Sequence, residues 1–517
     1  MIAGILKSNA KRHPDKTAVI FGDTRYTYKE FNDRANSLAN ALINMGLRKG
    51  DWVAMIADDC IQQMEMFWAG AKAGIATSAL NTTFSQRDFS HLIGNGKAKV
   101  VLCSHKYRNL VESLRPALKS VKEYIILGPS DKGFVGYEDL ISTSSSPEPD
   151  IEINENDLLY FANTSGTTGL SKQAMHTYKS LFATALMDLD VLNYDMSAGG
   201  VFLAATPLFV AYMIPRVSIL SFHMRCPLVI PPNLSPQTLL EIIEKERVTN
   251  IFGATAFFQP IIDYPDLGKY NYSSLRHIFI FGYYPPEVWR RAVELFGNIF
   301  IVGYGLSEIG FISFLPPEDF VFEGPPEKVN RVRSCGREPL WVEARVIDDQ
   351  GMDVQPGQVG EIIVKGHNMM KGYWNAPEAT EQTIKGGYIY TGDLASVDEE
   401  GYIYLAGRKK DSITTQGKVV LPLEIEEIIL QHPQVLEVAV IGVPDEELGE
   451  AVKAVVIKKD GDVTEEEIIA LCRENLPDHA VPQSVDFTES LPKTAGTGRI
   501  QRYQLRQKYL RTSSGGE

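Results

Sequence analysis

The chain alternates short apolar, β-rich runs with amphipathic helical patterns over about its first 400 residues. The β-rich runs are TAVIFG (17–22), WVAMIA (52–57), AKVVLCS (98–104), DLLYFAN (157–163), VFLAAT (201–206), RHIFIFG (276–282) and IFIVGYG (299–305). Strands that alternate with helices are typical of α/β layering, in which the sheets are largely parallel. The sequence therefore predicts an α/β fold whose large N-terminal domain contains mostly parallel sheets covered by helices.

The segment after Thr27 illustrates how local signals set the boundaries of a helix. Thr27 precedes Glu30 by three residues, which is the signature of a capping box. Apolar residues then recur at helical spacing from Phe31 to Leu42, and Gly46 supplies a stop. We expect a helix between Thr27 and Gly46.

A length of 517 residues predicts more than one domain. The polar, Pro/Ser-rich segment 140–156 is typical of a surface linker into the next unit. The segment DEEGYIYLAGRKKDSI (398–413) predicts a hairpin followed by a charged junction. We therefore expect two domains, 1–409 and 410–517.

Shorter elements follow the charged junction. The patterns predict a helix over 424–431, strands over 435–442 and 451–457, and a helix that begins at a second capping box, Thr464 with Glu467. These elements predict a small α+β domain of roughly 100 residues.

The charge balance and the cysteines limit the function classes. The chain has 51 basic and 65 acidic residues and a net charge of −14, which disfavours a general nucleic-acid binder. The five cysteines are widely spaced without a CxxC pair, so buried free thiols are expected. Neither a secretion signal nor an apolar run of about 18 residues is evident, so we predict a cytoplasmic protein without a membrane span.

The segment FANTSGTTGLSKQ (161–173) contains the strongest chemical signal. Its two glycines permit close approach of the backbone to a ligand, its hydroxyl side chains donate hydrogen bonds, and Lys172 adds a positive charge, a combination that suits a polyphosphate. The spacing differs from the GxxxxGK[ST] loop. By composition alone, a flexible turn is an equally good interpretation.

Five motifs in order resemble those of the adenylate-forming superfamily of acyl-CoA synthetases, peptide-synthetase adenylation domains and beetle luciferases. The five are TSGTTGLSK (164–172), VGYGLSE (302–308), YTGDL (390–394), GRKKDSITTQGKVVLPLEIE (407–426) and LPKTAGTGRIQR (491–502). The resemblance extends from about Thr27 to the end, and is closest in character to acyl-CoA synthetases. Departures from the family pattern include Ser171 for proline, Gln173 for glycine and Ser307 for threonine.

The resemblance implies a ligase that uses ATP, Mg²⁺ and coenzyme A. A carboxylate and ATP would form an acyl-adenylate and pyrophosphate, and a thiol would then take the acyl group. Because the first step brings anions together, its catalysis depends on positioning and on neutralisation of charge.

By resemblance, most of the candidate residues would bind the nucleotide or the metal. Glu308 would bind Mg²⁺ and act in catalysis with Lys172 and Arg499; Asp393 would accept hydrogen bonds from the ribose, and Arg408 would pair with ribose or phosphate. The remaining ATP/AMP-binding candidates are Thr164, Ser165, Gly166, Thr167, Thr168, Gly169, Tyr283, Tyr304, Gly305 and Ser307. Taken alone, Glu308, Asp393 and Arg408 would be a solvated carboxylate, a turn residue and part of a charge run.

The predicted acyl pocket contains the largest departures from the family pattern. Its candidates are Val210, Tyr212, Tyr283, Tyr284 and Gly303. Val210 replaces a histidine, and the two adjacent tyrosines replace small residues, so we expect a compact acid that is short, branched, medium-chain or aryl. Alternatively, both tyrosines turn outward or pack in the core.

The C-terminal motifs imply a mobile domain. Lys410 falls at the family's hinge, and Gly417 would lie by the pantetheine channel of coenzyme A, where only backbone fits, with Gln416 before it. Arg499 stands where the family has a catalytic lysine, in a loop one residue longer. Arginine keeps the charge but is planar and bulkier. Lys493 is an alternative for the role, although a structural one is expected of it.

Three functions remain open from the sequence. The first is an acid–CoA ligase, the second an enzyme that delivers the acyl group to a carrier protein or stops at acyl-AMP, and the third a weakened homologue that binds nucleotide or acyl ligand. A small carboxylic acid, ATP and coenzyme A are the expected partners, and a homodimer is left open.

Overall fold

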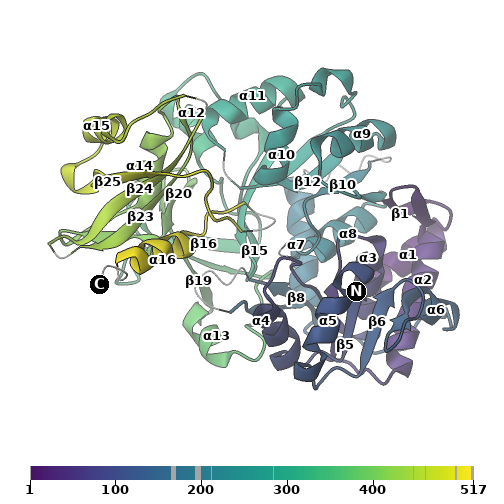
Figure 1. The fold of residues 1–517 in the computed structure, drawn as a ribbon. Coiled ribbons are helices and arrows are strands. Elements are labelled where there is room, and N and C mark those ends of the chain that lie inside the picture. The colour runs from purple at the N-terminus through teal and green to yellow at the C-terminus, as the bar shows by residue number, and fades with distance from the viewer. Residues whose placement is uncertain are drawn as a thin grey trace. The chain divides into compact units, whose positions relative to one another are not determined.

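The computed structural model describes residues 2–164, 170–192, 200–210, 212–282, 284–445, 447–459, 461–494 and 498–513, of which residues 511–513 are described by their backbone alone. The chain forms two compact units (Figure 1). The first unit consists of Met1–Glu343 and Val364–Ile389, and the second of Ala344–Ile363 and Tyr390–Glu517. Residues 390–409 thus belong to the same compact unit as the C-terminal residues, whereas the hinge predicted at Lys410 concerns movement and stays a prediction.

The first unit contains an eight-stranded sheet that is parallel from β14 to β1 and antiparallel at both edges. Its strands, in spatial order, are β15 (Gly310–Leu315), β14 (Phe300–Leu306), β13 (His277–Phe281), β12 (Asn250–Ala254), β10 (Phe202–Ala205), β11 (Leu228–Ile230), β1 (Thr17–Phe21) and β2 (Thr24–Thr27). The carboxyl ends of such parallel strands are the usual place for a ligand site.

A second, seven-stranded sheet of the first unit is parallel except for its last pair. Its order is β7 (Val135–Gly136), β6 (Glu123–Leu127), β5 (Val100–Ser104), β3 (Trp52–Ile56), β4 (Ala76–Ala79), β8 (Leu158–Asn163) and β9 (Gln173–Thr177). All seven β-rich runs identified in the sequence form strands of these two sheets, so the predicted parallel α/β architecture is confirmed.

The helices of the first unit follow the strands in alternation (Figure 1). They are α1 (Ile2–Arg12), α2 (Tyr28–Asn44), α3 (Ile61–Ala73), α4 (Gln86–Phe89), α5 (Arg108–Leu114), α6 (Tyr137–Ser142), α7 (Tyr178–Val191), α8 (Met213–His223), α9 (Pro236–Glu246), α10 (Thr255–Ile262), α11 (Pro286–Phe296), α12 (Pro326–Asn330) and α13 (Pro377–Thr383). The predicted capping box at the start of α2 is present: the Thr27 amide donates to Glu30 Oε2 (2.8 Å) and the Glu30 amide to Thr27 Oγ1 (3.2 Å).

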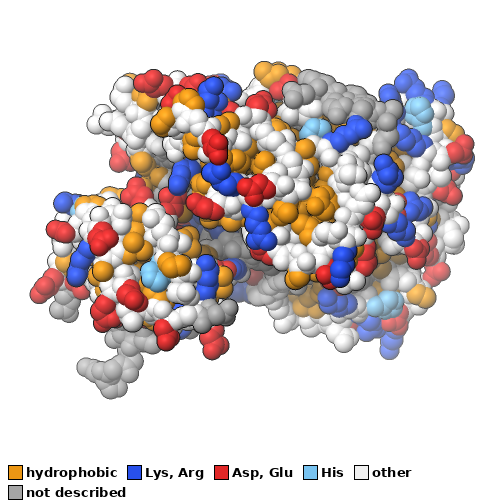
Figure 2. All heavy atoms as spheres, turned by 90° about the horizontal axis from the view of Figure 1, so that it is seen from above, with side chains coloured by type: hydrophobic (Ala, Val, Ile, Leu, Met, Phe, Trp, Pro, Cys, Tyr) orange, Lys and Arg blue, Asp and Glu red, His pale blue; other side chains and the backbone are white. Residues whose placement is uncertain are grey.

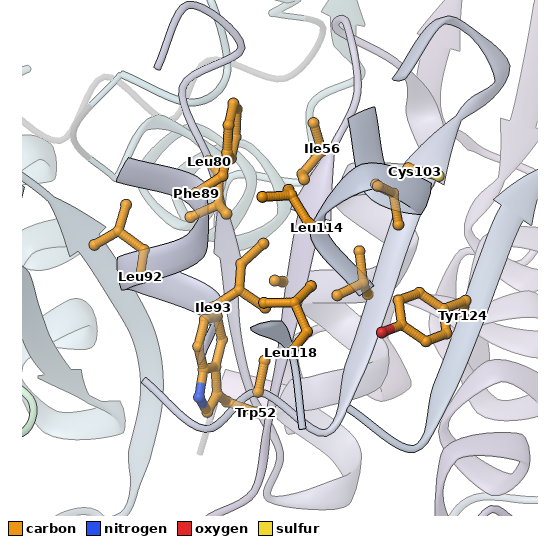
Figure 3. Packing of buried hydrophobic residues seen from close by; sticks show 14 of the residues in the cluster. Trp52, Ile56, Leu80, Phe89, Leu92, Ile93, Cys103, Leu114, Leu118 and Tyr124 are labelled. Carbon is orange, nitrogen blue, oxygen red and sulfur yellow. The ribbon is translucent and has the colours of Figure 1, made fainter. Parts of the chain in front are cut away.

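A buried hydrophobic cluster fixes the strand that leads into the predicted phosphate loop (Figure 3). Trp52 on β3 meets Phe161 on β8 edge to face, with ring centroids 5.2 Å apart. Its indole nitrogen donates to the Gly96 carbonyl (2.7 Å), which gives a buried N–H the partner that it requires. Because Phe161 is held in this core, the end of β8 at Asn163 has a fixed position.

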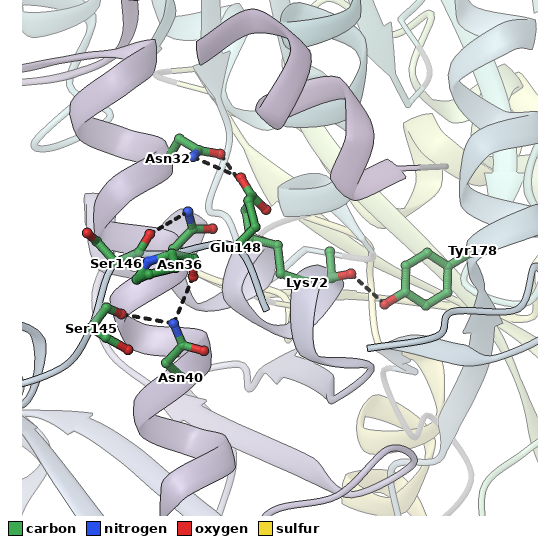
Figure 4. A network of polar contacts seen from close by, with 10 residues as sticks. Asn32, Asn36, Asn40, Lys72, Ser145, Ser146, Glu148 and Tyr178 are labelled. Atoms are coloured by element: carbon green, nitrogen blue, oxygen red, sulfur yellow. Dashed lines mark hydrogen bonds and ion pairs between the residues drawn. The ribbon is translucent and has the colours of Figure 1, made fainter. Parts of the chain in front are cut away.

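The predicted linker 140–156 lies within the first unit and does not separate the two compact units. Past α6 it is irregular, yet α2 and α3 hold it (Figure 4). The buried amine of Lys72 pairs with Glu148 (2.8 Å) and Asn32 (2.9 Å), while Asn36 donates to the Ser146 carbonyl (2.9 Å). Polar side chains of α2 and α3 therefore hold the segment 140–156 against the first unit. No sequence pattern indicates these contacts.

The second unit contains a five-stranded sheet with the order β22 (Lys418–Val420), β21 (Ile413–Thr415), β24 (Gly449–Lys458) and β23 (Val435–Asp445), and with β25 (Ser484–Phe487) beside β24. The unit also includes most of β16 (Val342–Ile347), β17 (Gly360–Gly366) and β19 (Tyr388–Val397), together with β20 (Ile403–Arg408). Its helices are α14 (Pro422–Ile429), α15 (Glu465–Asn475) and α16 (Arg502–Ser513). The second capping box is also present, because the Thr464 amide donates to Glu467 (2.8 Å) and the Glu467 amide to Thr464 (3.2 Å).

The expectations from the composition concern the cysteines, the charged side chains and the helix lengths. All five cysteines are buried and unbridged, as expected. Figure 2 shows acidic and basic side chains interspersed over the face that it draws. Within the described residues, no helix is long and apolar enough to cross a bilayer.

Candidate active site

The two ends of the predicted phosphate loop are joined by a β-ladder in the first unit. β8 and β9 pair antiparallel, with Asn163 opposite Gln173. The Thr164 amide donates to the Lys172 carbonyl (2.9 Å), and the Lys172 amide donates to Thr164 Oγ1 (3.0 Å). Lys172 itself is exposed. The predicted positions 165–169 and Tyr283 lie outside the described residues, so of the loop residues assigned to ATP the structure places only Thr164 and Lys172.

Glu308 lies in the turn that connects β14 and β15 in the hairpin at the edge of the sheet. A register shift occurs in this ladder between Tyr304 and Gly305. A Cβ atom at Gly305 would lie 1.8 Å from the Gly310 carbonyl oxygen, so only glycine allows the two strands to approach so closely. The turn that follows presents Ser307 and the half-buried Glu308 next to the phosphate-loop strands, because Ser307 Oγ lies 3.4 Å from the Asn163 carbonyl oxygen.

Tyr373, which belongs to none of the five sequence motifs, contacts residues from two of these motifs. The Tyr373 hydroxyl donates to Glu308 Oε1 (2.5 Å), and Lys172 Nζ lies 4.7 Å from the centre of the Tyr373 ring. Thr164, Lys172, Ser307 and Glu308 therefore gather in one place. The only sequence signal for Tyr373 is an aromatic residue after a glycine, a pattern too common to indicate a site.

A buried histidine supports the same turn. His176 on β9 donates from Nε2 to the Ser307 carbonyl (2.8 Å), and its ring meets the Tyr212 ring at 4.8 Å. Burial lowers the pKa of His176 to about 4, although the Ser307 carbonyl acts in the opposite direction. The imidazole is therefore neutral at pH 7 and serves as a hydrogen-bond donor.

Large aromatic side chains occupy the space beside the predicted acyl pocket. A Cβ atom at Gly303 would lie 2.2 Å from Cε1 of Phe311, and one at Gly310 would lie 1.4 Å from the Tyr212 hydroxyl oxygen. Tyr212 and Val210 are both buried, and Val210 sits in the turn that leads to α8. The surroundings of Gly303 and Tyr212 are thus filled by aromatic rings.

Tyr284 is buried and packs against Thr255 and Trp289. Its hydroxyl donates to the Thr255 carbonyl (2.6 Å), and its ring meets Trp289 edge to face at 4.8 Å. This placement matches the alternative that the side chain packs in the core. A role of Tyr284 in the acyl pocket stays a prediction.

A buried ion pair lies one helical turn past Tyr212, and the sequence did not indicate it either. Arg216 on α8 donates through Nε and Nη2 to the two carboxylate oxygens of Asp188 on α7, both at 2.7 Å. The guanidinium lies 3.7 Å from the centre of the Phe311 ring. Burial raises the pKa of Asp188, and the two hydrogen bonds from Arg216 oppose the change. An ion pair so deeply buried is neutral as a unit and places polar groups against the ring of Phe311.

The second unit brings together a different set of predicted residues. Asp393 on β19 stands opposite Arg408 on β20 in the ladder, and the two side chains form an ion pair. The Asp393 carboxylate is largely buried. Lys410 follows directly, and burial lowers its pKa, with Arg408 and Arg499 contributing in the same direction.

Arg499 lies on a loop that the backbone fastens near these charges. The Thr494 amide donates to the Arg499 carbonyl (2.8 Å), and the Arg499 amide donates to Thr494 Oγ1 (3.1 Å). Although the Arg499 side chain is accessible to solvent, surrounding protein atoms and then Arg408 lower its pKa. Among the described residues no carboxylate forms an ion pair with Arg499. Lys493 instead pairs with Glu437 on β23 (2.6 Å), which fits the structural role expected of it.

Gln416 and Gly417 form the two-residue loop of the hairpin between β21 and β22. Their φ angles are +52° and +72°, and the ladder closes with Thr415 opposite Lys418. A Cβ atom at Gly417 would meet no atom within 4 Å, so in this structure the conformation of the turn, and not crowding, favours glycine.

Glu308 is suited to bind a Mg²⁺ ion whose other ligands come from a substrate. Within the described residues no group of three or more His, Cys, Asp or Glu side chains could hold a metal ion alone. Mg²⁺ is commonly bound by one or two carboxylates together with substrate phosphates. Oε1 of Glu308 accepts from Tyr373, while Oε2 has no hydrogen-bond partner among the described residues.

Comparisons with known proteins define the family. The model of the AMP-binding enzyme family matches residues 6–374, and that of the AMP-binding enzyme C-terminal domain matches residues 424–497. The chain therefore belongs to the AMP-binding enzyme family, which is the adenylate-forming superfamily expected from the motifs.

Two relatives and one solved structure extend the match over nearly the whole chain. A feruloyl-CoA synthase of an Amycolatopsis species is 31% identical over 502 residues, which cover 97% of both proteins. A long-chain-fatty-acid–CoA ligase of Escherichia coli is 30% identical over 549 residues, which cover 98% of this chain and 94% of the relative. The ATP-bound structure of MatB from Rhodopseudomonas palustris superimposes with a TM-score of 0.88 at 28% identity, over 98% of this chain and 99% of MatB.

The chain is thus an AMP-forming acid–CoA ligase that uses ATP, with Mg²⁺ and coenzyme A as is usual for this family. Its mixed α/β fold, with a large N-terminal and a smaller C-terminal part, is confirmed. The two relatives are named for very different acids, so similarity alone does not define the acid.

Proposed function

We propose that this ligase activates a compact carboxylic acid that is short, branched, medium-chain or aryl. The observation that carries this proposal is a pair of aromatic side chains that cover two glycines: Phe311 covers Gly303, which is a predicted pocket residue, and Tyr212, itself a predicted pocket residue, covers Gly310. Beyond them lies the ion pair of Arg216 with Asp188, whose desolvated charges a long alkyl tail would have to displace.

In the first step, an oxygen of the acid attacks the α-phosphorus of ATP, and the bond to pyrophosphate breaks. Lys172 and the loop 164–169 would hold the phosphates, and Glu308 would hold Mg²⁺ with them. Arg499 would neutralise charge between carboxylate and phosphate. The contacts of Tyr373 with both Lys172 and Glu308 support this assignment.

In the second step, the sulfur of coenzyme A attacks the acyl carbonyl carbon, and AMP leaves with the oxygen. Asp393 and Arg408 would bind the ribose or phosphate of the nucleotide, and Gln416 and Gly417 would lie by the pantetheine. We keep the division into domains 1–409 and 410–517, with Lys410 as the hinge, as part of this proposal.

A panel of acids tests the substrate class. Acid-dependent exchange of pyrophosphate into ATP and CoA-dependent release of AMP are measured with acids of two to sixteen carbons and with benzoate and cinnamate derivatives. We expect kcat/KM for the compact acids to exceed that for a sixteen-carbon acid by about 10-fold or more, since each misplaced methylene changes binding by about 1 kcal/mol. A preference for the long acid would contradict the proposal.

Phe311→Leu sharpens this test. The smaller side chain opens space beside Gly303, so we expect the preference to move toward longer acids by about 10-fold in relative kcat/KM. Phe258→Leu is the matched control, because Phe258 is also buried but packs against Phe296 and Phe300. Equal shifts in both variants would contradict the role of Phe311.

The same panel separates the remaining functions. Exchange without CoA-dependent release of AMP would favour delivery to a carrier protein, or an enzyme that stops at acyl-AMP. Binding of ATP without exchange for any acid would favour the weakened homologue, for which the replacement at Arg499 is the motivating observation. We further propose a cytoplasmic location, and light scattering would decide whether the enzyme is a homodimer.

A further inference from the structure

We propose that Tyr373 is a positioning residue that sets the geometry of both Glu308 and Lys172. The inference rests on the proposed roles of these two residues in binding Mg²⁺ and phosphate. One side chain makes both contacts: the hydroxyl donates to Glu308 Oε1 (2.5 Å), and the ring lies 4.7 Å from Lys172 Nζ. Tyr373 is 6% exposed, so the ring has little freedom to move.

The backbone around Tyr373 runs beside β9 and is fixed by a ladder of hydrogen bonds. The Met175 amide donates to the Gly372 carbonyl (2.9 Å), and the Trp374 amide donates to the Gln173 carbonyl (2.9 Å). Tyr373 itself forms an antiparallel bridge with Ala174. The strand that leaves the phosphate loop therefore sets the position of Tyr373.

Three further contacts lock the same segment. Trp374 Nε1 donates to the Gly96 carbonyl (2.8 Å), and the Tyr373 amide donates to Thr380 Oγ1 (2.9 Å). The Met370 amide donates to the Glu308 carbonyl (2.7 Å), so that the backbone of Glu308 is held as well as its side chain. The tyrosine thus acts from a rigid frame, as positioning of a ligand within fractions of an ångström requires.

The chemistry of tyrosine explains why the two contacts are compatible with catalysis. A neutral hydroxyl orients the carboxylate of Glu308 without offsetting its charge, which leaves that charge for a cation. The face of the ring attracts the ammonium of Lys172 without neutralising it, which leaves three N–H donors for phosphate. An arginine or a glutamate at this position would instead cancel one of the two charges.

Three variants separate the hydroxyl, the ring and general stability. Tyr373→Phe removes the contact to Glu308 and keeps the ring, whereas Tyr373→Leu removes both. Tyr178→Phe is the control, because the buried Tyr178 hydroxyl donates to a different partner, the Ala71 carbonyl of α3 (2.8 Å) (Figure 4). Two readouts are used: the Mg²⁺ concentration for half-maximal pyrophosphate exchange, and ATP binding by calorimetry at fixed Mg²⁺ without acid.

We expect Tyr373→Phe to raise the half-saturating Mg²⁺ concentration by about 10-fold, because a hydrogen bond to a charged group is lost, while ATP affinity at saturating Mg²⁺ changes by less than about threefold. Tyr373→Leu should weaken ATP binding about threefold more through loss of the cation–π contact. Tyr178→Phe should change neither quantity.

An unchanged Mg²⁺ requirement in Tyr373→Phe would overturn the inference, and so would equal changes in Tyr373→Phe and Tyr178→Phe. Glu308→Gln in the same titration distinguishes this failure from a failure of the proposed function. If Glu308→Gln leaves the Mg²⁺ requirement unchanged, the assigned role of Glu308 is wrong, and the inference falls with it. If Glu308→Gln raises the requirement and Tyr373→Phe does not, only the inference is wrong.

Discussion

The two compact units each contain a carboxylate that the motifs assign to the nucleotide, and the two carboxylates are held in different ways. In the first unit Glu308 accepts from the neutral hydroxyl of Tyr373, and the turn before it is held by the neutral His176. In the second unit Asp393 is paired with the guanidinium of Arg408. Among the described residues Glu308 forms no ion pair, whereas the charge of Asp393 is offset by that of Arg408.

This difference matches two kinds of binding. A carboxylate with an uncompensated charge suits a cation, because the attraction is strong where water is partly excluded. A carboxylate beside a guanidinium suits neutral hydroxyl groups, to which it remains an acceptor without requiring another positive charge. The supports therefore favour the roles proposed for Glu308 as a metal ligand and for Asp393 as a ribose ligand.

The largest effect should come from removing the uncompensated charge. Glu308→Gln keeps the size and the contact to Tyr373 but loses the charge, so kcat/KM for pyrophosphate exchange should fall on the order of 10³-fold, about 4 kcal/mol. Asp393→Asn keeps an oxygen acceptor for the ribose, and about 30-fold, near 2 kcal/mol, is expected.

Glu327→Gln, an exposed glutamate of the first unit, is the matched control and should remain within about twofold of the wild type. If Asp393→Asn proved more harmful than Glu308→Gln, the contrast between a cation ligand and a hydroxyl ligand would be lost.

A decrease in pH should lower the free energy of unfolding of the first unit, because the buried His176 is neutral in the folded protein. The pKa of His176 is about 4 in the folded protein, below the ordinary value of 6.5, so between these values the unfolded chain binds the proton more readily. Stability is therefore complete above pH 6.5 and falls as the pH decreases, by about 3 kcal/mol at pH 4. In His176→Gln the free energy of unfolding should fall by about 3 kcal/mol less than in the wild type between pH 6.5 and pH 4.

Tryptophan fluorescence during urea unfolding measures this effect in the first unit selectively. All five tryptophans, Trp52, Trp68, Trp289, Trp341 and Trp374, belong to that unit. His105→Gln, which changes an exposed histidine, is the control and should retain the wild-type pH dependence. Parallel pH profiles for the wild type and His176→Gln would show that His176 does not titrate as its burial requires.

Substitution of Arg499 tests whether its positive charge in the second unit contributes to adenylation. Because no carboxylate among the described residues pairs with it, its charge is free to act on an anion. Arg499→Ala should lower adenylation on the order of 100-fold, about 2.7 kcal/mol, whereas Arg499→Lys should stay within about 10-fold of the wild type. Thioester formation from supplied acyl-AMP should change by less than about threefold.

Arg473→Ala, at an exposed position on α15 of the same unit, is the control for loss of a positive charge. If neither alanine nor lysine at position 499 changed adenylation, Arg499 would be a bystander, and the unpaired positive charge of the second unit would have no catalytic role.

Local signals in the sequence account for most of the fold that was predicted. The capping boxes at Thr27 and Thr464 predicted helix starts that the structure confirms, because each depends on residues only three positions apart. Apolar runs predicted the strands for the same reason, since burial on both faces leaves its mark within a single run. The pairing order of the strands and the attachment of 140–156 to Lys72 depend on distant residues and could not be predicted in this way.

Some residues of the candidate site could likewise be predicted from local motifs, and others could not. Lys172, Glu308, Asp393 and Arg408 lie in motifs with fixed local spacing, and the resemblance identified them. Tyr373, which contacts Glu308 across 65 positions, has no local signature. The same holds for the ion pair of Arg216 with Asp188, 28 positions apart, because buried partners of this kind are defined only by tertiary packing.

The smallest predicted effect concerns backbone conformation in the second unit. Gln416 and Gly417 have positive φ angles in a two-residue hairpin loop, where Asn-Gly is favoured and glutamine is strained. Gln416→Asn should therefore stabilise the hairpin by about 0.5–1 kcal/mol, seen as slower amide hydrogen exchange at Thr415 and Lys418. Gln431→Asn, exposed and without a positive φ, is the control and should leave this exchange unchanged. Because the substitution alters no charge, stabilisation without a change in adenylation would separate backbone strain from the ion pairs of this unit. Equal or faster exchange would mean that Gln416 adopts its conformation without strain.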